Sequence, residues 1–310
     1  VHMIKIIIGA IFILLLTPPT LLAGYGFYHG LNVLNGLKSV ALALTDMYGP
    51  ILTGEQMVTE KAVGRSVKTV IWSGDIENQA LLETSGLAES SLGSDILFAV
   101  NDSGNAPKVF ALRKDGSDLG AWLIDYPESH DIEDLASFTW QDKAYLLIAD
   151  TGDNLQWRPL LTLAIIEEPV TPFISGSPKL PIAWSFQFRY PGGFRDCEAV
   201  AVDSEEGYIY LISKWRVPAE VYRVPLRPET NIVTATKVAS LTNLPQPNKR
   251  DEFEDPEYGR TRSLPTALDM KGSRAIVTTY KDAYLFTRSR HETWAQAFSA
   301  IPERIPLPDI

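Results

Sequence analysis

The sequence predicts an all-β protein, a β-propeller, preceded by a single transmembrane helix at its N-terminus. Two observations predict this class. A unit of short β-type strands separated by turn residues occurs four times after residue 65. An uncharged apolar run stands close to the N-terminus. We therefore expect a transmembrane anchor at 1–24, an amphipathic helix and linker at 25–64, and a propeller domain at 65–310.

The N-terminal segment has the composition of a membrane helix. It carries no charge from Ile6 to Ala23, and Lys5 precedes it. A run of about 18 to 20 apolar residues is just long enough to cross the hydrocarbon of a bilayer. Leu21 is too bulky for position −3 of a cleavage site after Ala23, so we expect the helix to be retained as an anchor. A cleaved leader, which would leave a soluble exported protein, is the alternative.

The residues after the anchor should lie at the membrane surface. Lys5 is expected on the inner side and the bulk of the chain on the outer side. The segment from Leu31 to Met47 has apolar residues near helical spacing, and it could pack on the bilayer, on a partner helix or on its own domain. Aromatic residues that could contact the far interface and a partner are Tyr25, Phe27 and Tyr28.

The repeated unit predicts the propeller. Its first strand reads SGLAES at 85, EDLASF at 133, EAVAVD at 198 and TALDMK at 266. A second apolar strand follows in each unit and ends at a polar residue or a tyrosine, namely Asn101, Asp150, Lys214 and Tyr280. Repeated four-stranded units are typical of propeller blades, whereas a β-sandwich does not require the same order four times. Four blades are visible, and the ring could contain five or six, with 67–74 as an outer strand that closes it.

Composition excludes several functions. The formal net charge is −10, so an interaction with nucleic acid is not expected. Cys197 is the one cysteine, which excludes an internal disulfide and a cysteine-based zinc site, and we expect it to be a small buried residue.

Several motifs resemble those of a bacterial family of exported or membrane-anchored propellers that has no firm activity. They are SGLAES, NDSG, IEDLA, ADTGDN and CEAVAVD, within about residues 80 to 290. The family is loosely similar to phytase-like and gluconolactonase-like propellers. The resemblance implies the propeller fold and an exported location. Together with the anchor, it predicts a single-pass protein of the bacterial inner membrane, with the propeller on the periplasmic side.

Polar residues at the strand ends suggest a metal site. In a propeller these positions face the central channel, and Ca²⁺ prefers several oxygen ligands in a loose geometry. The proposed calcium ligands are Glu83, Asn101, Glu133, Asp150, Glu198 and Asp269, within a wider acidic set that also contains Asp102, Asp131, Asp134, Asp153 and Asp196. Lys214 occupies the same position of the repeat as Asn101 and Asp150, so its ammonium group would stand among the proposed ligands. A network of ion pairs and turn caps without metal is therefore the other interpretation.

The sequence contains few residues and motifs that are typical of catalytic sites. Of the four histidines only His130 stands near the acidic set. The sequence contains no G-x-S-x-G elbow, phosphate-binding glycine loop or H-E-x-x-H helix. We therefore predict no catalytic residues.

Two further stretches suggest contact surfaces. Trp157 and Arg158 follow a turn, and these residue types are favoured at interface centres, although packing between blades would also explain them. The charged insertion at 248–262 is either a mobile solvated loop or a docking element that a partner orders.

The leading hypothesis is a non-catalytic scaffold or stabilising subunit of a bacterial membrane protein complex, without a cofactor. A photosynthetic reaction-centre and antenna complex or a respiratory complex would be examples of the host. The alternative is a Ca²⁺-dependent periplasmic hydrolase, lactonase-like or phosphoesterase-like, in which the ion polarises the substrate.

Overall fold

The computed structural model describes residues 51–52, 63–64, 74–93, 95–126, 131–173, 179–256 and 259–307. All of them belong to one compact unit, Pro50–Ile310. The predicted anchor, the helix at 31–47 and the aromatic residues Tyr25, Phe27 and Tyr28 lie outside the described residues. None of the helices within those ranges is long and apolar enough to cross a bilayer.

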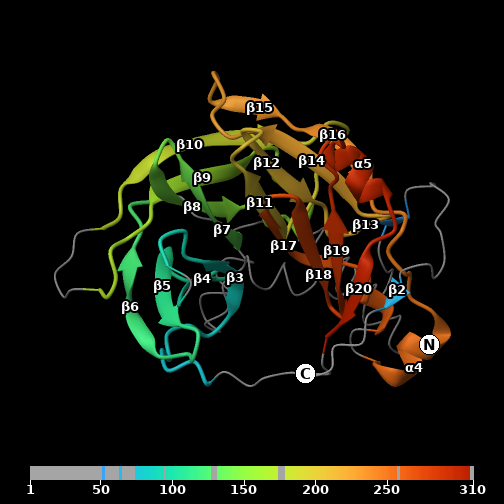
Figure 1. Ribbon diagram of the computed structural model, residues 1–310, viewed down its shortest axis with the longest axis horizontal. Helices are drawn as coiled ribbons and strands as arrows, with labels where there is room; N and C mark the ends of the chain where they lie inside the picture. Colours follow the sequence, from blue (N-terminus) through green and yellow to red (C-terminus); the bar gives the residue numbers. More distant parts are fainter. Residues whose placement is uncertain are drawn as a thin grey trace, which may run out of the picture. The chain divides into compact units, whose positions relative to one another are not determined.

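Four antiparallel sheets follow one another along the chain in the arrangement of a β-propeller (Figure 1). Blade 1 consists of β3 (Thr84–Glu89), β4 (Ile96–Asn101), β5 (Lys108–Arg113) and β6 (Asp118–Leu123). Blade 2 consists of β7 (Ile132–Trp140), β8 (Lys143–Asp150), β9 (Leu161–Glu167) and β10 (Ile182–Arg189), with β15 (Ile232–Thr234) parallel to β10. The prediction of an all-β propeller is confirmed, and the sandwich alternative is wrong.

The remaining strands complete two more blades. Blade 3 consists of β11 (Ala199–Asp203), β12 (Tyr208–Ile212), β14 (Glu220–Pro225) and β16 (Thr236–Ser240). Blade 4 consists of β17 (Pro265–Lys271), β18 (Arg274–Thr279), β19 (Asp282–Thr287) and β20 (Glu303–Pro306), with β2 (Val63–Gly64) parallel to β20. Outside the blades, β1 (Ile51–Leu52) pairs with β13 (Arg216–Val217), and the short helices are α4 (Lys249–Glu254), η1 (Gly259–Thr261) and α5 (Trp294–Ser299).

The apolar strands are explained by blades that are covered on both faces. In β8, Leu146 and Ile148 belong to the cluster between blades 1 and 2. Leu147 and Ala149 alternate with them and belong to the cluster between blades 2 and 3. A strand that is buried on both faces reads as a continuous apolar run rather than an alternating one. The predicted outer strand at 67–74 lies outside the described residues except for Gly74, and β2 is the outermost strand of blade 4.

The glycine of SGLAES allows the inner strands of blades 1 and 2 to approach closely. A Cβ atom on Gly86 would lie 2.5 Å from the backbone N of Leu135 and 2.7 Å from the carbonyl C of Asp134. The next pair of inner strands is joined by the side chain of Asp134, which accepts a 2.7 Å hydrogen bond from the backbone N–H of Val200 in β11. The recurring motif therefore serves the contacts between neighbouring blades around the centre.

The described parts of the charged insertion, 248–256 and 259–262, contain buried ion pairs. Asp251, at the start of α4, is buried and lies 2.6 Å from Nη1 of Arg262 and 3.2 Å from Nζ of Lys281. Arg262 also contacts Asp282 of blade 4 at 3.1 Å. Neither predicted alternative, a mobile loop or an element ordered by a partner, included this internal network.

Candidate functional site

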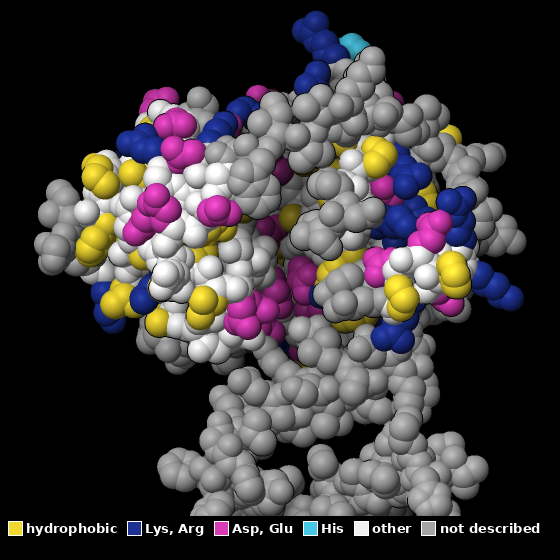
Figure 2. Space-filling view, turned by 90° about the horizontal axis from the view of Figure 1, so that it is seen from below, with side chains coloured by type: hydrophobic (Ala, Val, Ile, Leu, Met, Phe, Trp, Pro, Cys, Tyr) yellow, Lys and Arg dark blue, Asp and Glu magenta, His cyan; other side chains and the backbone are white. Residues whose placement is uncertain are grey.

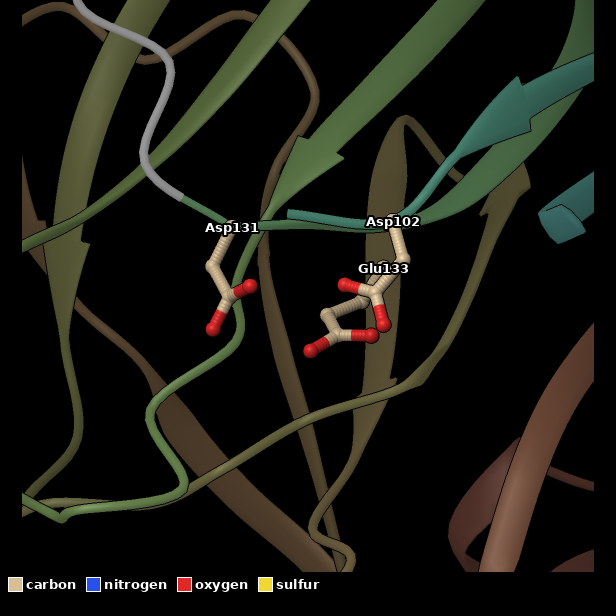
Figure 3. A group of neighbouring side chains, drawn as sticks. All are labelled: Asp102, Asp131 and Glu133. Atoms are coloured by element: carbon tan, nitrogen blue, oxygen red, sulfur yellow. The ribbon is translucent and has the colours of Figure 1, made fainter. Parts of the chain in front are cut away.

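Three carboxylates from blades 1 and 2 converge where the inner strand β7 begins. Asp102 directly follows β4, Asp131 directly precedes β7, and Glu133 is the second residue of β7. One carboxylate oxygen from each lies within 4.8 Å of those of the other two. Figure 3 shows the three side chains pointing to the same side of the ribbon. We call Asp102, Asp131 and Glu133 the carboxylate cluster.

The turn after β8 lies directly against this cluster. A Cβ atom on Gly152 would lie 2.4 Å from Oε1 of Glu133 and 2.5 Å from Oδ2 of Asp131. The Gly152 N–H donates a 3.2 Å hydrogen bond to the Asp131 carbonyl oxygen. Any side chain at position 152 would overlap these carboxylates, which explains the glycine of the ADTGDN motif.

A fourth carboxylate stands behind the turn. Asp196 is almost completely buried, with 1% of its surface exposed. Its Oδ1 accepts a 2.7 Å hydrogen bond from the Asp153 N–H, whereas its Oδ2 has no hydrogen-bond partner although it is buried. Such an orphaned buried oxygen is costly and calls for a physical explanation.

The electrostatics of the site reflect this crowding of acids. Burial raises the pKa of Glu133 well above its ordinary value, and the charges of Glu198, Asp196, Asp102 and Asp131 raise it further. Burial also raises the pKa of Glu198 to about 7, despite the opposing effect of the neighbouring ammonium of Lys214. In the space-filling view, acidic side chains gather along the central hollow of the face shown (Figure 2). The site is therefore built to attract positive charge.

Part of the acidic set forms ion pairs, as the metal-free interpretation expects. Lys214 is buried and bonds to Glu198. Asp150 is fully buried, and its carboxylate accepts hydrogen bonds from Arg158 at 2.8 Å, from the Asp131 N–H at 3.0 Å and from the Tyr126 hydroxyl at 2.9 Å. These pairs account for Glu198 and Asp150, but they do not account for Oδ2 of Asp196.

The structure brings together only some of the residues proposed as calcium ligands. Glu133 lies in the cluster, and Glu198 is close enough to raise its pKa. Asn101 is held by the backbone: its Oδ1 accepts from the Glu83 N–H at 3.3 Å and its Nδ2 donates to the Ala80 carbonyl at 2.8 Å. The side chain of Glu83 is exposed beside this turn.

Asp269 lies apart from the cluster. It lines a cavity of about 320 Å³ where the inner strands end, together with Glu89 and Lys271. When the repeated motifs are aligned, Thr266 is the residue of blade 4 that is equivalent to Glu133. Thr266 precedes Asp269 by three residues. Three residues of a strand span about 10 Å, so Asp269 cannot share the position of Glu133. Its assignment to the same site is corrected on this ground.

Sequence reasoning did not assign a role to Gly152, and it left Asp102, Asp131 and Asp196 out of the chosen ligands. The sequence does contain a pattern that identifies Asp131 and Asp196. Blade 2 begins with Asp131-Ile-Glu133 and blade 3 with Asp196-Cys-Glu198, which is the same D-x-E pattern at equivalent positions. The pattern predicts carboxylates in pairs at the start of successive inner strands.

The Trp157 turn lies beside the site. Asp153 is buried, and its Oδ1 accepts hydrogen bonds from the backbone N–H groups of Trp157 at 2.9 Å and Arg158 at 3.1 Å. The guanidinium of Arg158 donates to the Gly152 carbonyl at 2.6 Å and is used internally. The side chain of Trp157 is 52% exposed, so it does not fill the space between blades. The structure thus separates the two residues that the sequence paired as a contact surface.

In the parts of the chain that the structure describes, neither histidine nor cysteine is placed to act as a catalytic group. His130 lies outside them, and His291 is exposed. Cys197 is buried, as predicted, and burial raises the pKa of its thiol to about 12. A thiol with so high a pKa is a poor nucleophile.

Comparison with known proteins gives distant structural similarities. No family model matches the chain, and no curated protein matches it. A chain of the nidogen/laminin complex has a TM-score of 0.35 and 11% identity, with coverage of 66% of this chain and 75% of that one. Apo ctPRC2 in an autoinhibited state has a TM-score of 0.34 and 13% identity, with coverage of 68% and 39%. Hsv2 of Kluyvelomyces marxianus has a TM-score of 0.33 and 7% identity, with coverage of 71% and 57%. Similarities this low carry no argument about function.

The raised pKa of Glu133 gives a prediction for stability. With divalent cations removed by EDTA, Glu133→Gln is expected to be more stable than the unchanged chain at neutral pH. Folding costs this carboxyl group nothing below its unfolded pKa of about 4.5, and the cost grows as the pH rises towards the higher folded pKa. The advantage of the variant should therefore vanish at acid pH. Thermal unfolding across a pH series measures it, and a variant that is less stable at neutral pH would contradict the prediction.

Proposed function

We propose that the protein is a non-catalytic docking subunit of a bacterial membrane complex, held at the periplasmic face of the inner membrane by its N-terminal segment. The observation that carries this proposal is the Trp157 turn. A large aromatic side chain that is 52% exposed stands on a backbone fixed by buried Asp153. Holding such a residue rigidly in solvent favours binding, because little conformational entropy is lost when a partner covers it.

The charge of the surroundings supports a basic partner surface. The chain carries a formal net charge of −10, and the carboxylate cluster lies against Gly152, which precedes the Trp157 turn. The expected partner surface is therefore basic, with an apolar pocket for the indole ring. The apolar N-terminal sequence, with Tyr25, Phe27 and Tyr28 after it, favours a partner within a membrane assembly such as a photosynthetic or respiratory complex.

Extraction of the native membrane in a mild detergent tests the proposal. The full chain is expected to migrate with other subunits, and Trp157→Ala is expected to weaken the association by about 30-fold or more, the effect of an interface hot spot of about 2 kcal/mol. Val170→Ala is the control, because Val170 is an apolar but not aromatic residue, in the loop after β9, that is 86% exposed. Migration of the unchanged chain alone at monomer size would contradict the proposal, as would equal effects of the two variants.

A Ca²⁺-dependent hydrolase is the second candidate, and Glu198 favours it. A carboxyl group with a pKa of about 7 can accept a proton at neutral pH, as a general base must. Purified protein supplied with CaCl₂ would then turn over lactones or phosphoesters, and Glu198→Gln would abolish turnover. Absence of turnover by the unchanged chain would dismiss this candidate.

A further inference from the structure

We propose that Asp102, Asp131 and Glu133 bind a Ca²⁺ ion, with Asp196 in support behind them. This inference is independent of the docking function. The three carboxylates come from two blades, and each offers an oxygen atom within 4.8 Å of the others. An ion with Ca–O bonds of about 2.3 to 2.6 Å can bridge oxygens that are about 5 Å apart on opposite sides of it. Figure 3 shows the three carboxylates directed to one space.

Asp196 provides an independent observation that points to a cation. Its carboxylate is 1% exposed, and Oδ2 lacks a hydrogen-bond partner. The Asp153 N–H fixes the other oxygen at 2.7 Å. A buried carboxylate oxygen without a donor is costly unless the group takes up a proton or positive charge lies close to it. Lys214 supplies part of that charge but bonds to Glu198. A cation in the carboxylate cluster would supply the remainder.

The donor set selects the class of ion. The converging side chains of the cluster offer carboxylate oxygens, and hard oxygen ligands favour Ca²⁺ or Mg²⁺ over zinc or copper. The nearby thiol of Cys197 is buried and directed to the Ala199 carbonyl at 3.6 Å. Ligands on separate blades give an adaptable geometry, which Ca²⁺ accepts and Mg²⁺, with its strict octahedron, does not.

The surrounding backbone is shaped to leave room for such a site. Gly152 brings the main chain to a position where a Cβ atom would lie 2.4 Å from Oε1 of Glu133. The Ser85 hydroxyl donates to Oε2 of the same carboxylate at 3.1 Å, and this leaves Oε1 on the Gly152 side. An ion bound here would join Asp102 of blade 1, Asp131 and Glu133 of blade 2 and, through Asp153, the start of blade 3.

Calorimetric titration of the full chain in detergent, after EDTA treatment and dialysis, tests the inference. CaCl₂ is expected to bind with a stoichiometry of one and to raise the melting temperature, and MgCl₂ is expected to bind at least about tenfold more weakly. Glu133→Gln and Asp131→Asn should each weaken Ca²⁺ binding by about tenfold or more, and Asp196→Asn by a similar or smaller factor. Asp269→Asn is the matched control, because this acid lines the cavity at the other end of the inner strands, and binding should be unchanged.

Several outcomes would overturn the inference. They are the absence of Ca²⁺ binding by the unchanged chain, equal binding by Glu133→Gln and Asp131→Asn, a larger loss in Asp269→Asn, or a preference for Mg²⁺. Circular dichroism and the melting temperature in EDTA show whether each variant is folded, and two separate ligand variants keep the test valid if one of them is not. Failure of Ca²⁺ binding leaves the effect of Trp157→Ala on docking unchanged, so the two proposals fail separately.

Discussion

Gly86→Ala is expected to lower the free energy of unfolding by about 3 kcal/mol. The added methyl group would lie 2.5 Å from the backbone N of Leu135 and 2.7 Å from the carbonyl C of Asp134. These are main-chain atoms of the neighbouring inner strand β7, so no side chain can rotate to relieve the overlap. The blades would have to separate at the centre, where the contacts between β3 and β7 are close.

Urea denaturation measures the effect, with Gly93→Ala as the control. Gly93 also lies in blade 1, in the turn before β4, but a Cβ atom there would have nothing within 4 Å. Its replacement should change the unfolding free energy by less than about 0.5 kcal/mol. If both variants unfold at the same urea concentration, the close approach of the inner strands is not what holds blades 1 and 2 together.

Arg262→Met is expected to cost about 3 kcal/mol and to expose the insertion at 248–262 to proteases. Arg262 is buried and bonds two buried carboxylates, Asp251 at 2.6 Å and Asp282 at 3.1 Å. Its removal leaves both carboxylates without their main partner. Lys281 remains 3.2 Å from Asp251, and Arg304 remains 2.9 Å from Asp282. These two cations keep the expected cost at the lower end of the range for a broken buried pair.

Arg250→Met serves as the control for the same insertion. Arg250 is an exposed residue of α4, and solvent screens its 2.8 Å pair with Glu254, so the loss of this pair should change stability little. Limited proteolysis and thermal unfolding should therefore distinguish the two arginines. Equal resistance to proteolysis would mean that the buried ion pairs do not order the insertion.

The repeat made the blades predictable because each blade is covered on both faces. The resulting apolar runs, such as YLLIA before Asp150, recur with turn residues at similar positions, and the observed strands end close to those turn residues, as β8 does at Asp150. The insertion was not predictable in the same way. Its order depends on Arg262, which contacts Asp282 twenty residues later, and charge composition alone indicates only an exposed segment.

The candidate site was predictable in its chemistry but less so in its membership. Acids at strand ends were expected to converge, and Glu133 does lie in the cluster. Asn101 was chosen over its neighbour Asp102, yet the Asn101 side chain is held by backbone groups of 80 and 83. Adjacent residues point to opposite sides of an extended chain, so an error of one residue changes which side chain faces the centre.

The pairing of β2 with β20 has a mechanical consequence. Val63 and Gly64 lie beside Glu303 and Arg304, and Ile51 and Leu52 lie beside Arg216 and Val217. Both short strands stand upstream of blade 1 in the sequence but are bonded to elements that come much later. Tension applied to the chain from its N-terminal side would consequently load the β12–β14 connection and the last blade before it reached the first.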